Sequence, residues 1–295
     1  MDIIDQTVTD IKSLKIQGAT NILNASLKAL KTWLSGKDTI TPEEFKEKVF
    51  LLTSARPTEP LTINLLGMLI AKFANPSKKE AVLAIEDIEV LLSSIEDKIA
   101  LYGKEQLKEK NAILTHCHSR TIEKIILQTF KENGNLKVYT TETRPMFQGR
   151  ITATNLAAAG ISVNLITDGF APYLISQNEI KAFIIGADAI LSDGSIINKV
   201  GSFGIALSAW RENIPVYIAC TLLKYVPQEL KMESRDSNEI WDSPPSGVTI
   251  INPAFDIVPE KFITGLITEA GFLKTSEVTS KIKEIYPWII TSAKM

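Results

Sequence analysis

The stretch Asn111-Ala112-Ile113-Leu114-Thr115-His116-Cys117-His118-Ser119-Arg120 joins an apolar run of strand length to a cluster of reactive side chains. It contains both histidines of the protein and one of its two cysteines. Residues 121–130, which follow it, place apolar side chains at helical spacing, so the cluster is predicted to lie on a turn from a strand into a helix. In open α/β sheets, such turns are where ligands bind.

Similar strand-like runs recur beyond this stretch and alternate with helical segments. With the first run included, they occupy residues 112–115, 136–141, 163–167, 183–190 and 216–220. This alternation predicts βαβ units and a parallel sheet. Most runs end on polar residues that this topology should bring to one crevice: Cys117, Glu142, Asp168, Asp188 and Thr221. Residues 262–268 are predicted to add an edge strand, and residues 282–290 a closing segment.

The chain before this stretch has a helical pattern and no convincing strand. Gly36 is a stop signal, and Thr41-Pro42-Glu43-Glu44 supplies an N-cap, a proline at the first helical position and acidic residues in the first turn. The polar residues 102–111 are predicted to join two domains. The predicted fold is therefore α/β, with a helical N-terminal domain, residues 1–104, followed by a parallel-sheet domain, residues 105–295.

The composition of the chain argues against several classes of partner. The formal net charge is −2, and acidic and basic residues are interspersed, so we expect neither nucleic acid nor a membrane surface to be bound. The longest uncharged apolar run, residues 61–71, is too short to span a bilayer, and the first five residues lack the positive charge of a secretion signal. Two cysteines do not make a disulfide framework. These features predict a cytoplasmic, reduced protein.

The triplet His116-Cys117-His118 allows three interpretations. It is poorly arranged as a metal site, because alternation along an extended chain turns the histidines to one face and the cysteine to the other, and no CxxC or HxxxH spacing occurs elsewhere. Cys117 is alternatively a buried, inert structural thiol. In the third interpretation it is an acid/base or nucleophilic group at a strand end, where the N-terminus of the next helix lowers the pKa of a thiol.

Asp188 directly follows the apolar run 182–187, so we expect its carboxyl to be partly desolvated, with a pKa raised toward neutrality. A raised pKa suits a general acid. The alternative is an aspartate that caps a turn or a helix. Residues 192–202 then combine turn residues with Asn198 and Lys199 and lead into a helix predicted over 202–213, a geometry that suits an oxyanion or a phosphate.

Three further cations are candidates for binding an anion. Arg144 follows the second strand of the series and is either a surface charge or a bidentate clamp. Arg56 in the helical half and Lys224 after the fifth strand have the same two interpretations, and single cations of this kind are more often solvated than functional.

Several motifs, in order along nearly the whole chain, resemble those of one superfamily: Thr115-His116-Cys117-His118-Ser119, Thr141-Glu142-Thr143-Arg144-Pro145, Gly186-Ala187-Asp188 and Asn198-Lys199-Val200-Gly201. The superfamily contains methylthioribose-1-phosphate isomerase, archaeal ribose-1,5-bisphosphate isomerase and the α, β and δ subunits of translation initiation factor 2B. The ribose-1,5-bisphosphate isomerase branch is the most similar, on the basis of Arg56-Pro57-Thr58, Arg235-Asp236 and Asn252-Pro253-Ala254-Phe255-Asp256.

This resemblance implies a helical N-terminal domain, a Rossmann-like C-terminal domain, and assembly into a homodimer or homohexamer. It implies that Cys117 and Asp188 are the catalytic pair, which the initiation-factor subunits generally lack. The implied phosphate and sugar contacts are Gly18, Ala19, Arg56, Ser119, Asn198, Lys199 and Lys224, to which we add Arg144 as a candidate clamp. One position departs from the family, because its Arg-Gly-Ala is Gln17-Gly18-Ala19 in this chain.

The implied pair suits the conversion of a 1-phosphorylated aldose, such as ribose 1,5-bisphosphate, into a ketose. An acid, Asp188, protonates the departing ring oxygen, and a base, Cys117, removes the proton from C2 and later protonates C1. Neither step needs a metal or a nucleotide cofactor, and the chain has no P-loop or GxGxxG. The alternative is a non-catalytic regulatory subunit that binds a nucleotide or sugar phosphate and initiation factor 2; Gln17 favours it, or a changed substrate.

Overall fold

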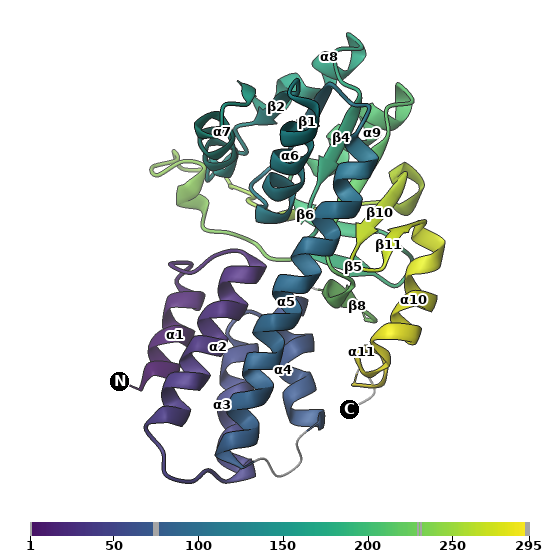
Figure 1. Ribbon diagram of the computed structural model, residues 1–295. Helices are drawn as coiled ribbons and strands as arrows, with labels where there is room; N and C mark the ends of the chain where they lie inside the picture. Colours follow the sequence, from purple (N-terminus) through teal and green to yellow (C-terminus); the bar gives the residue numbers. More distant parts are fainter. Residues whose placement is uncertain (1, 73–76, 229, 231, 293–295) are drawn as a thin grey trace. The chain divides into compact units, whose positions relative to one another are not determined.

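The computed structural model describes residues 2–72, 77–228, 230 and 232–292, which form two compact units (Figure 1). Unit 1 comprises Met1–Ser94, Leu223–Gln228 and Ile282–Met295, and unit 2 comprises Ile95–Leu222 and Glu229–Lys281. Helix α5, Lys78–Leu107, belongs to both units, which divide between Ser94 and Ile95. The boundary predicted at residue 104 therefore falls inside this helix. Among the described residues, none of the helices combines the length and apolar composition that crossing a membrane requires.

Unit 1 is built from helices packed on an aliphatic core. Its elements are α1 (Ile3–Lys12), α2 (Ala19–Ser35), α3 (Pro42–Ser54), α4 (Pro60–Lys72), the first part of α5, the end of α10 (Val278–Ile285), α11 (Pro287–Ser292) and the short strand β8 (Tyr225–Val226). The predicted start of α3 is confirmed: Thr41 Oγ1 accepts from the Glu44 N–H at 3.2 Å, and Glu44 Oε2 accepts from the Thr41 N–H at 3.1 Å. This reciprocal pair satisfies two backbone donors that the helix leaves free.

Unit 2 contains a mostly parallel sheet with the strand order β11-β10-β7-β4-β1-β2-β3. The strands are β1 (Ala112–Thr115), β2 (Lys137–Thr141), β3 (Ser162–Ile166), β4 (Ala182–Ile185), β7 (Val216–Ala219), β10 (Gly265–Thr268) and β11 (Gly271–Leu273). All neighbours are parallel except β10 and β11. The predicted α/β fold with a parallel sheet is confirmed.

Helices cover both faces of this sheet. Helices α6 (Arg120–Asn133) and α7 (Gln148–Ala158) connect β1 to β2 and β2 to β3, and they contact each other. Helices α8 (Ala171–Ser176) and α9 (Ser202–Arg211) precede β4 and β7 and also contact each other. Because the chain moves toward β3 in the first pair and back toward β7 in the second, right-handed crossovers place the two pairs on opposite faces.

Two strand predictions are wrong in detail. Residues 183–190 are not one strand: the chain leaves the parallel sheet after β4 and forms β5 (Ala189–Leu191), which pairs antiparallel with β6 (Ile196–Lys199), itself antiparallel to β9 (Phe255–Val258). The break falls at Gly186–Asp188, where Asp188 is the one polar residue. The predicted edge strand begins only at Gly265 and is not an edge, because the short hairpin strand β11 covers it.

A close backbone contact requires glycine at position 149, in the first turn of α7. A Cβ atom added there would lie 1.7 Å from the Thr141 carbonyl oxygen, and that backbone atom cannot rotate away. We therefore expect Gly149→Ala to lower the free energy of unfolding by about 2–3 kcal/mol in urea denaturation. Gly67→Ala is the control, because its Cβ has nothing within 4 Å and alanine favours the helix α4. Equal effects of the two substitutions would contradict the prediction.

Candidate active site

The candidate site lies where the order of the parallel strands reverses. From β1 the chain moves outward through β2 to β3 and then returns to β4 on the other side of β1. Cys117 follows β1 and Asp188 follows β4, so the two predicted catalytic residues flank this switch point. Open α/β sheets bind their ligands at such a crevice.

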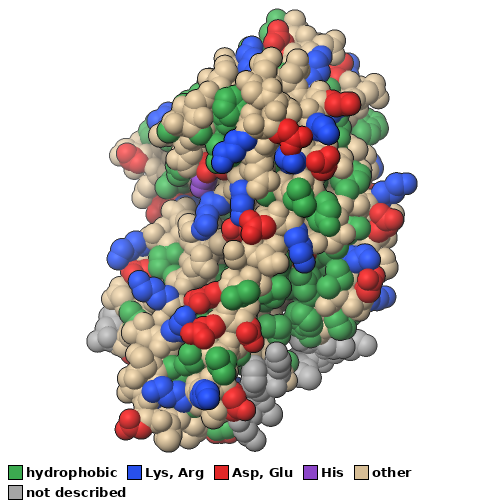
Figure 2. Space-filling view, in the orientation of Figure 1, with side chains coloured by type: hydrophobic (Ala, Val, Ile, Leu, Met, Phe, Trp, Pro, Cys, Tyr) green, Lys and Arg blue, Asp and Glu red, His purple; other side chains and the backbone are tan. Residues whose placement is uncertain are grey.

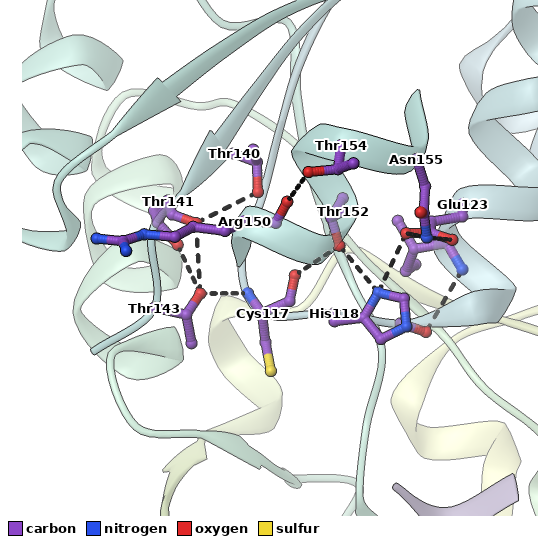
Figure 3. Close-up of polar contacts among 12 residues, drawn as sticks. Cys117, His118, Glu123, Thr140, Thr141, Thr143, Arg150, Thr152, Thr154 and Asn155 are labelled. Carbon is purple, nitrogen blue, oxygen red and sulfur yellow. Dashed lines mark hydrogen bonds and ion pairs between the residues drawn. The ribbon is translucent and has the colours of Figure 1, made fainter. Parts of the chain in front are cut away.

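Cys117 is held by its backbone in an uncommon conformation, with φ at 68°. Its N–H donates to Thr143 Oγ1 at 2.9 Å, and its carbonyl accepts from Thr152 Oγ1, on α7, at 3.2 Å. The sulfur points away from both hydrogen bonds (Figure 3). Left-handed backbone at a residue other than glycine costs about 1–3 kcal/mol and persists only where its surroundings hold it. The two threonines therefore hold the Cys117 peptide while its thiol stays uncommitted to them.

His118 belongs to a second set of polar contacts, on the opposite side of Cys117 from Thr143 in Figure 3. Its Nδ1 lies 3.1 Å from Glu123 Oε1 and 3.2 Å from Thr152 Oγ1. Because the Thr152 hydroxyl hydrogen goes to the Cys117 carbonyl and the carboxylate can only accept, Nδ1 must carry the proton that it shares between them. Asn155 also donates to Glu123. His118 thus orients Thr152 instead of facing the thiol as a metal ligand would.

The thiol of Cys117 is protonated at neutral pH in the ligand-free protein, because burial raises its pKa to about 11. The positive charge of Lys199 lowers this pKa and the negative charge of Asp188 raises it, so both groups lie within electrostatic reach of the sulfur. The expected lowering of the pKa by a helix N-terminus is wrong. Helix α6 begins three residues later, and its N-cap, Ser119, uses its own hydroxyl to accept from the Ile122 N–H.

Asp188 is partly exposed at the turn between β4 and β5. Its backbone N–H donates to the Ile197 carbonyl at 2.8 Å, which ties the turn to β6. The chain continues from Asp188 into a strand and not into a helix, so the residue is not a helix N-cap. Its carboxyl is therefore available to a ligand at the switch point. Among the described residues, no group of three His, Cys, Asp or Glu side chains is placed to hold a metal ion.

The loop from β6 to α9 carries the predicted phosphate-binding residues. Asn198 is buried and its Nδ2 donates to Ser202 Oγ at 2.9 Å, while Lys199 Nζ lies 5.1 Å from the centre of the Phe255 ring. The carboxylate of Asp256 accepts from the N–H groups of Gly201 and Phe203, at 2.7 and 3.1 Å. Asp256 therefore already supplies the negative charge at the N-terminus of α9. Lys199 is the residue of this loop whose positive charge can bind an anionic ligand.

Asp256 makes stability depend on pH. Burial raises its pKa to about 6, although two backbone N–H groups oppose the shift. The folded protein then binds the proton more tightly than the unfolded chain, whose aspartates titrate near 4. The contribution of Asp256 to the free energy of unfolding is therefore present below about pH 4 and is lost as the pH rises to about 6.

We expect the stability difference between wild type and Asp256→Asn to change by at most about 3 kcal/mol between pH 4 and 6, and to stay constant above pH 7. The wild type should lose stability relative to the variant across that window, because the amide does not ionise. Urea denaturation at pH 4.5, 5.5 and 7.5 measures the difference. Stability curves that run parallel over this range would contradict the assignment.

The other predicted contacts are distributed over both units. Ser119 caps α6, and Arg144 is exposed, with its backbone N–H on Asp168 Oδ2 at 2.7 Å and its guanidinium 5.1 Å from the centre of the Phe147 ring. Four lie in unit 1: Gly18 at the N-cap of α2, Ala19 next to it, Arg56 paired with the buried Glu59 at 3.5 Å, and Lys224 at the end of the turn Leu222–Lys224. The structure thus brings Cys117, Asp188 and Lys199 together in unit 2.

Asp168, one of the strand-end residues predicted to reach the crevice, accepts from the N–H groups of Thr143 and Arg144, both at 2.7 Å, and so fixes the turn after β2. Thr143 and Thr152 support the site and were not predicted as part of it. Thr152 gave no signal in the sequence, because it lies within a helix and meets Cys117 only in the folded chain.

Charged side chains of both signs are interspersed on the surface in Figure 2, in agreement with the net charge of −2.

The chain as a whole is similar to several known proteins. The model of the Initiation factor 2 subunit family matches residues 15–275. The chain is 35% identical to a ribose 1,5-bisphosphate isomerase from Methanocaldococcus jannaschii, over 98% of this chain and 97% of that protein. It is 32% identical to a methylthioribose-1-phosphate isomerase from Trichoplax adhaerens, over 93% of this chain and 87% of that protein.

The fold also resembles a solved structure of a translation initiation factor eIF-2B from Pyrococcus horikoshii OT3. The TM-score is 0.80 at 24% sequence identity, and the match covers 92% of this chain and 96% of that one. A solved 5-methylthioribose 1-phosphate isomerase from the same organism also has a TM-score of 0.80, at 25% sequence identity over 96% of this chain and 88% of that one. An isomerase and a translation factor therefore share this architecture.

Proposed function

Because the chain belongs to the Initiation factor 2 subunit family, we propose that it is a cytoplasmic sugar-phosphate isomerase and that it converts ribose 1,5-bisphosphate into ribulose 1,5-bisphosphate. The observation that carries the proposal is the placement of a thiol and a carboxyl, Cys117 and Asp188, on either side of the switch point with Lys199 within electrostatic reach. The names of the relatives support an isomerase, and they include more than one sugar phosphate.

The pair divides the reaction into two proton transfers. Protonated Asp188 delivers its proton to the ring oxygen as the bond from C1 to that oxygen breaks, and the Cys117 thiolate removes the proton from C2. The resulting enol phosphate is protonated at C1 by the Cys117 thiol, while the enol hydroxyl on C2 loses its proton to the Asp188 carboxylate and becomes the ketone. Both groups return to their starting states, and no atom is gained or lost.

The two catalytic groups are coupled through their charges. Because the charge of Asp188 raises the pKa of Cys117, protonation of Asp188 lowers that pKa. Moving one proton from the Cys117 thiol to the Asp188 carboxylate therefore gives the state that the reaction requires, with a thiolate and a neutral carboxyl. Lys199, whose charge lowers the pKa of the same thiol, stabilises the thiolate form.

Substrate binding in unit 2 is proposed for Lys199, Asn198 and Ser119, with Arg144 as an exposed clamp. Gly18, Ala19, Arg56 and Lys224 of unit 1 stay predicted phosphate or sugar contacts on the strength of the resemblance alone. A lysine or arginine contact to a phosphate is a charge-assisted hydrogen bond, worth about 1.5–3 kcal/mol each.

One experiment tests the proposal directly. Purified protein is incubated with ribose 1,5-bisphosphate and, separately, with methylthioribose 1-phosphate, and proton NMR follows the anomeric signal. We expect the signal of the bisphosphate to disappear as the ketose forms. Loss with only the methylthioribose compound would keep the isomerase and change the substrate. If both signals persist although the compounds bind, the isomerase proposal fails.

One observation favours the second candidate function, a non-catalytic regulatory subunit that binds initiation factor 2. Gln17 stands where the family has an arginine, and its Nε2 donates to the Leu14 carbonyl at 2.8 Å. A neutral amide engaged with its own backbone offers less to a phosphate than a guanidinium does.

Gln17→Arg separates these candidates. In an isomerase with an otherwise intact pocket we expect KM for the bisphosphate to fall, by an amount equivalent to about 1–3 kcal/mol of binding free energy. We expect kcat to stay unchanged, because a distal phosphate is held equally in the ground and transition states. Steady-state kinetics measure both constants. Gln6→Arg, which adds the same charge on the exposed face of α1, is the control. A KM that stays constant or rises would favour a pocket rebuilt for another ligand.

We further propose that the protein is a homodimer or homohexamer. Three large apolar side chains one and two turns apart, Phe203, Leu207 and Trp210, are exposed by 40%, 38% and 53% on helix α9. Exposed apolar stripes of this kind mark protein contacts. Light scattering coupled to size exclusion gives the subunit number, and a monomer at micromolar concentration would reject the proposal.

A further inference from the structure

The turns that follow the neighbouring strands β1 and β2 each contain a residue with a strained backbone conformation. Cys117 after β1 has φ 68°, and Thr143 after β2 has φ 63°. For a β-branched residue such as threonine, a positive φ is a true outlier. Thr143 is also fully buried, and its hydroxyl accepts from the Cys117 N–H at 2.9 Å. The surrounding contacts must therefore hold both residues in these conformations.

The contacts form a chain of hydrogen bonds that leads away from Cys117. Thr143 Oγ1 lies 3.2 Å from Thr141 Oγ1, and Thr141 Oγ1 lies 2.6 Å from Nδ1 of His116. His116 Nε2 lies 2.9 Å from the carbonyl oxygen of Val200. His116 and Thr141 are buried, so water does not compete for these bonds. The chain joins the ends of β1 and β2 to the loop that carries Lys199.

The direction of every bond in this chain follows from its two ends. The Val200 carbonyl can only accept, so Nε2 of His116 carries a hydrogen and, in the neutral ring, Nδ1 accepts one from Thr141. Burial lowers the pKa of His116, the nearby charge of Asp168 opposes this and that of Lys199 assists it, and the ring is neutral. The Thr141 hydroxyl is then used as a donor, so it accepts in its contact with Thr143. The Thr143 hydroxyl is shared between Thr141 Oγ1 at 3.2 Å and the Thr141 carbonyl at 3.4 Å, and its oxygen accepts from the Cys117 N–H.

The loop at the far end packs directly on the imidazole. A Cβ atom at Gly201 would lie 3.2 Å from both Cε1 and Nε2 of His116, closer than most real contacts, and the φ of Gly201 is 107°. The Asp256 carboxylate also holds this glycine, because it accepts from the Gly201 N–H at 2.7 Å. Neither the His116 ring nor the loop can therefore move without the other.

We propose that His116, Thr141 and Thr143 are positioning residues that fix the Cys117 thiol relative to Lys199 through this directed chain of hydrogen bonds. None of them need touch the substrate. Thr143 sets the Cys117 peptide, Thr141 passes the constraint to His116, and His116 anchors it on the Lys199 loop. The proposal rests on the proposed isomerase function for its kinetic consequence, whereas the placement of the thiol beside Lys199 is measurable without any sugar phosphate.

Thr141→Val tests the chain, because valine keeps the shape and removes the hydroxyl. The matched control is Thr140→Val: Thr140 is the adjacent residue of β2 and equally buried, and within the described part of the chain its hydroxyl donates to the Thr141 carbonyl alone, at 3.4 Å. The readout is the rate of alkylation of Cys117 by iodoacetamide as a function of pH, quantified on the Cys117 peptide by mass spectrometry. Thr141→Ser, which restores the hydroxyl, is the rescue.

We expect Thr141→Val to slow alkylation at pH 9 at least threefold, because a released loop carries the Lys199 charge away from the thiol and displaces the pH profile upward. Thr141→Ser should return the profile to that of the wild type, and Thr140→Val should leave it there. In turnover, Thr141→Val should lower kcat/KM at least tenfold, and part of that loss should appear as a raised KM, because Lys199 is also the proposed phosphate contact of this loop; Thr140→Val should change neither constant. Coincident profiles for Thr141→Val and Thr140→Val would overturn the proposal.

A second pair keeps the test decisive if Thr141→Val does not fold. Thr143→Ser keeps the hydroxyl and Thr143→Ala removes it, and both relieve the crowding of a β-branched residue at positive φ. The alkylation profile should shift for alanine only, and equal profiles would overturn the proposal. A wild type that turns over no sugar phosphate, yet shows these shifts, would reject the isomerase and leave the positioning chain standing.

Discussion

Cys117→Ser should bind ribose 1,5-bisphosphate as tightly as the wild type and turn it over about 10³-fold more slowly. The substitution exchanges one atom at a residue whose backbone N–H and carbonyl are held by Thr143 and Thr152, so the fold around it should persist. A serine hydroxyl is far less acidic than a thiol and cannot act as the base toward C2. Steady-state kinetics and calorimetric binding separate the two effects, and turnover within a few-fold of the wild type would remove Cys117 from the chemistry.

Cys220→Ala is the matched control. Cys220 directly follows β7 and is buried, so we expect its loss to leave kcat and KM unchanged. Iodoacetamide gives an independent check on the thiol itself. With a pKa of about 11, the thiolate fraction of Cys117 increases about tenfold for each pH unit between 8 and 10, and the alkylation rate should do the same. A rate that levels off near pH 8 would contradict the effect of burial.

Asp188→Asn should also lower kcat by about 10³-fold, with KM little changed, because the amide keeps the shape of the carboxyl and has no proton to give to the ring oxygen. The comparison of kcat with KM distinguishes an acid from a ligand. If KM rises and kcat is preserved, Asp188 holds a sugar hydroxyl and the acid must be sought elsewhere.

The same variant should make Cys117 more reactive although it destroys turnover. The negative charge of Asp188 raises the pKa of the thiol, so the neutral amide lowers that pKa and speeds alkylation at pH 8. Asp193→Asn is the control, because Asp193 lies on the neighbouring turn and accepts from Ser195 instead. Slower alkylation in Asp188→Asn would mean that the two groups do not share a proton as proposed.

The parallel sheet and the placement of Cys117 and Asp188 could be predicted because they depend on local patterns. Alternating apolar runs and helices fix a βαβ order, and the ends of parallel strands share one edge. The break between β4 and β5 was missed because Gly186 and Ala187 continue the apolar run, and only Asp188 signals the turn.

The environment of the thiol could not be predicted in the same way. A strand end before a helix suggested a lowered pKa, but the sign is decided by burial, which is a property of the folded chain. The roles of Thr141, Thr143 and Thr152 depend on hydroxyl directions, and these are set by contacts between residues 25 to 84 positions apart. Asp256 belongs to the same class, since it reaches α9 from 55 residues away.

The bond from His116 Nε2 to the Val200 carbonyl gives the site its own spectroscopic reporter. An imidazole N–H that is buried and donates to a backbone oxygen exchanges slowly with water, so its proton resonance should be resolved downfield of the amide envelope. The signal needs no label on the ligand. A phosphate that settles on the loop beside Val200 would perturb the chemical shift, and a titration followed at this one resonance would count binding at the Lys199 loop separately from binding anywhere else on the protein.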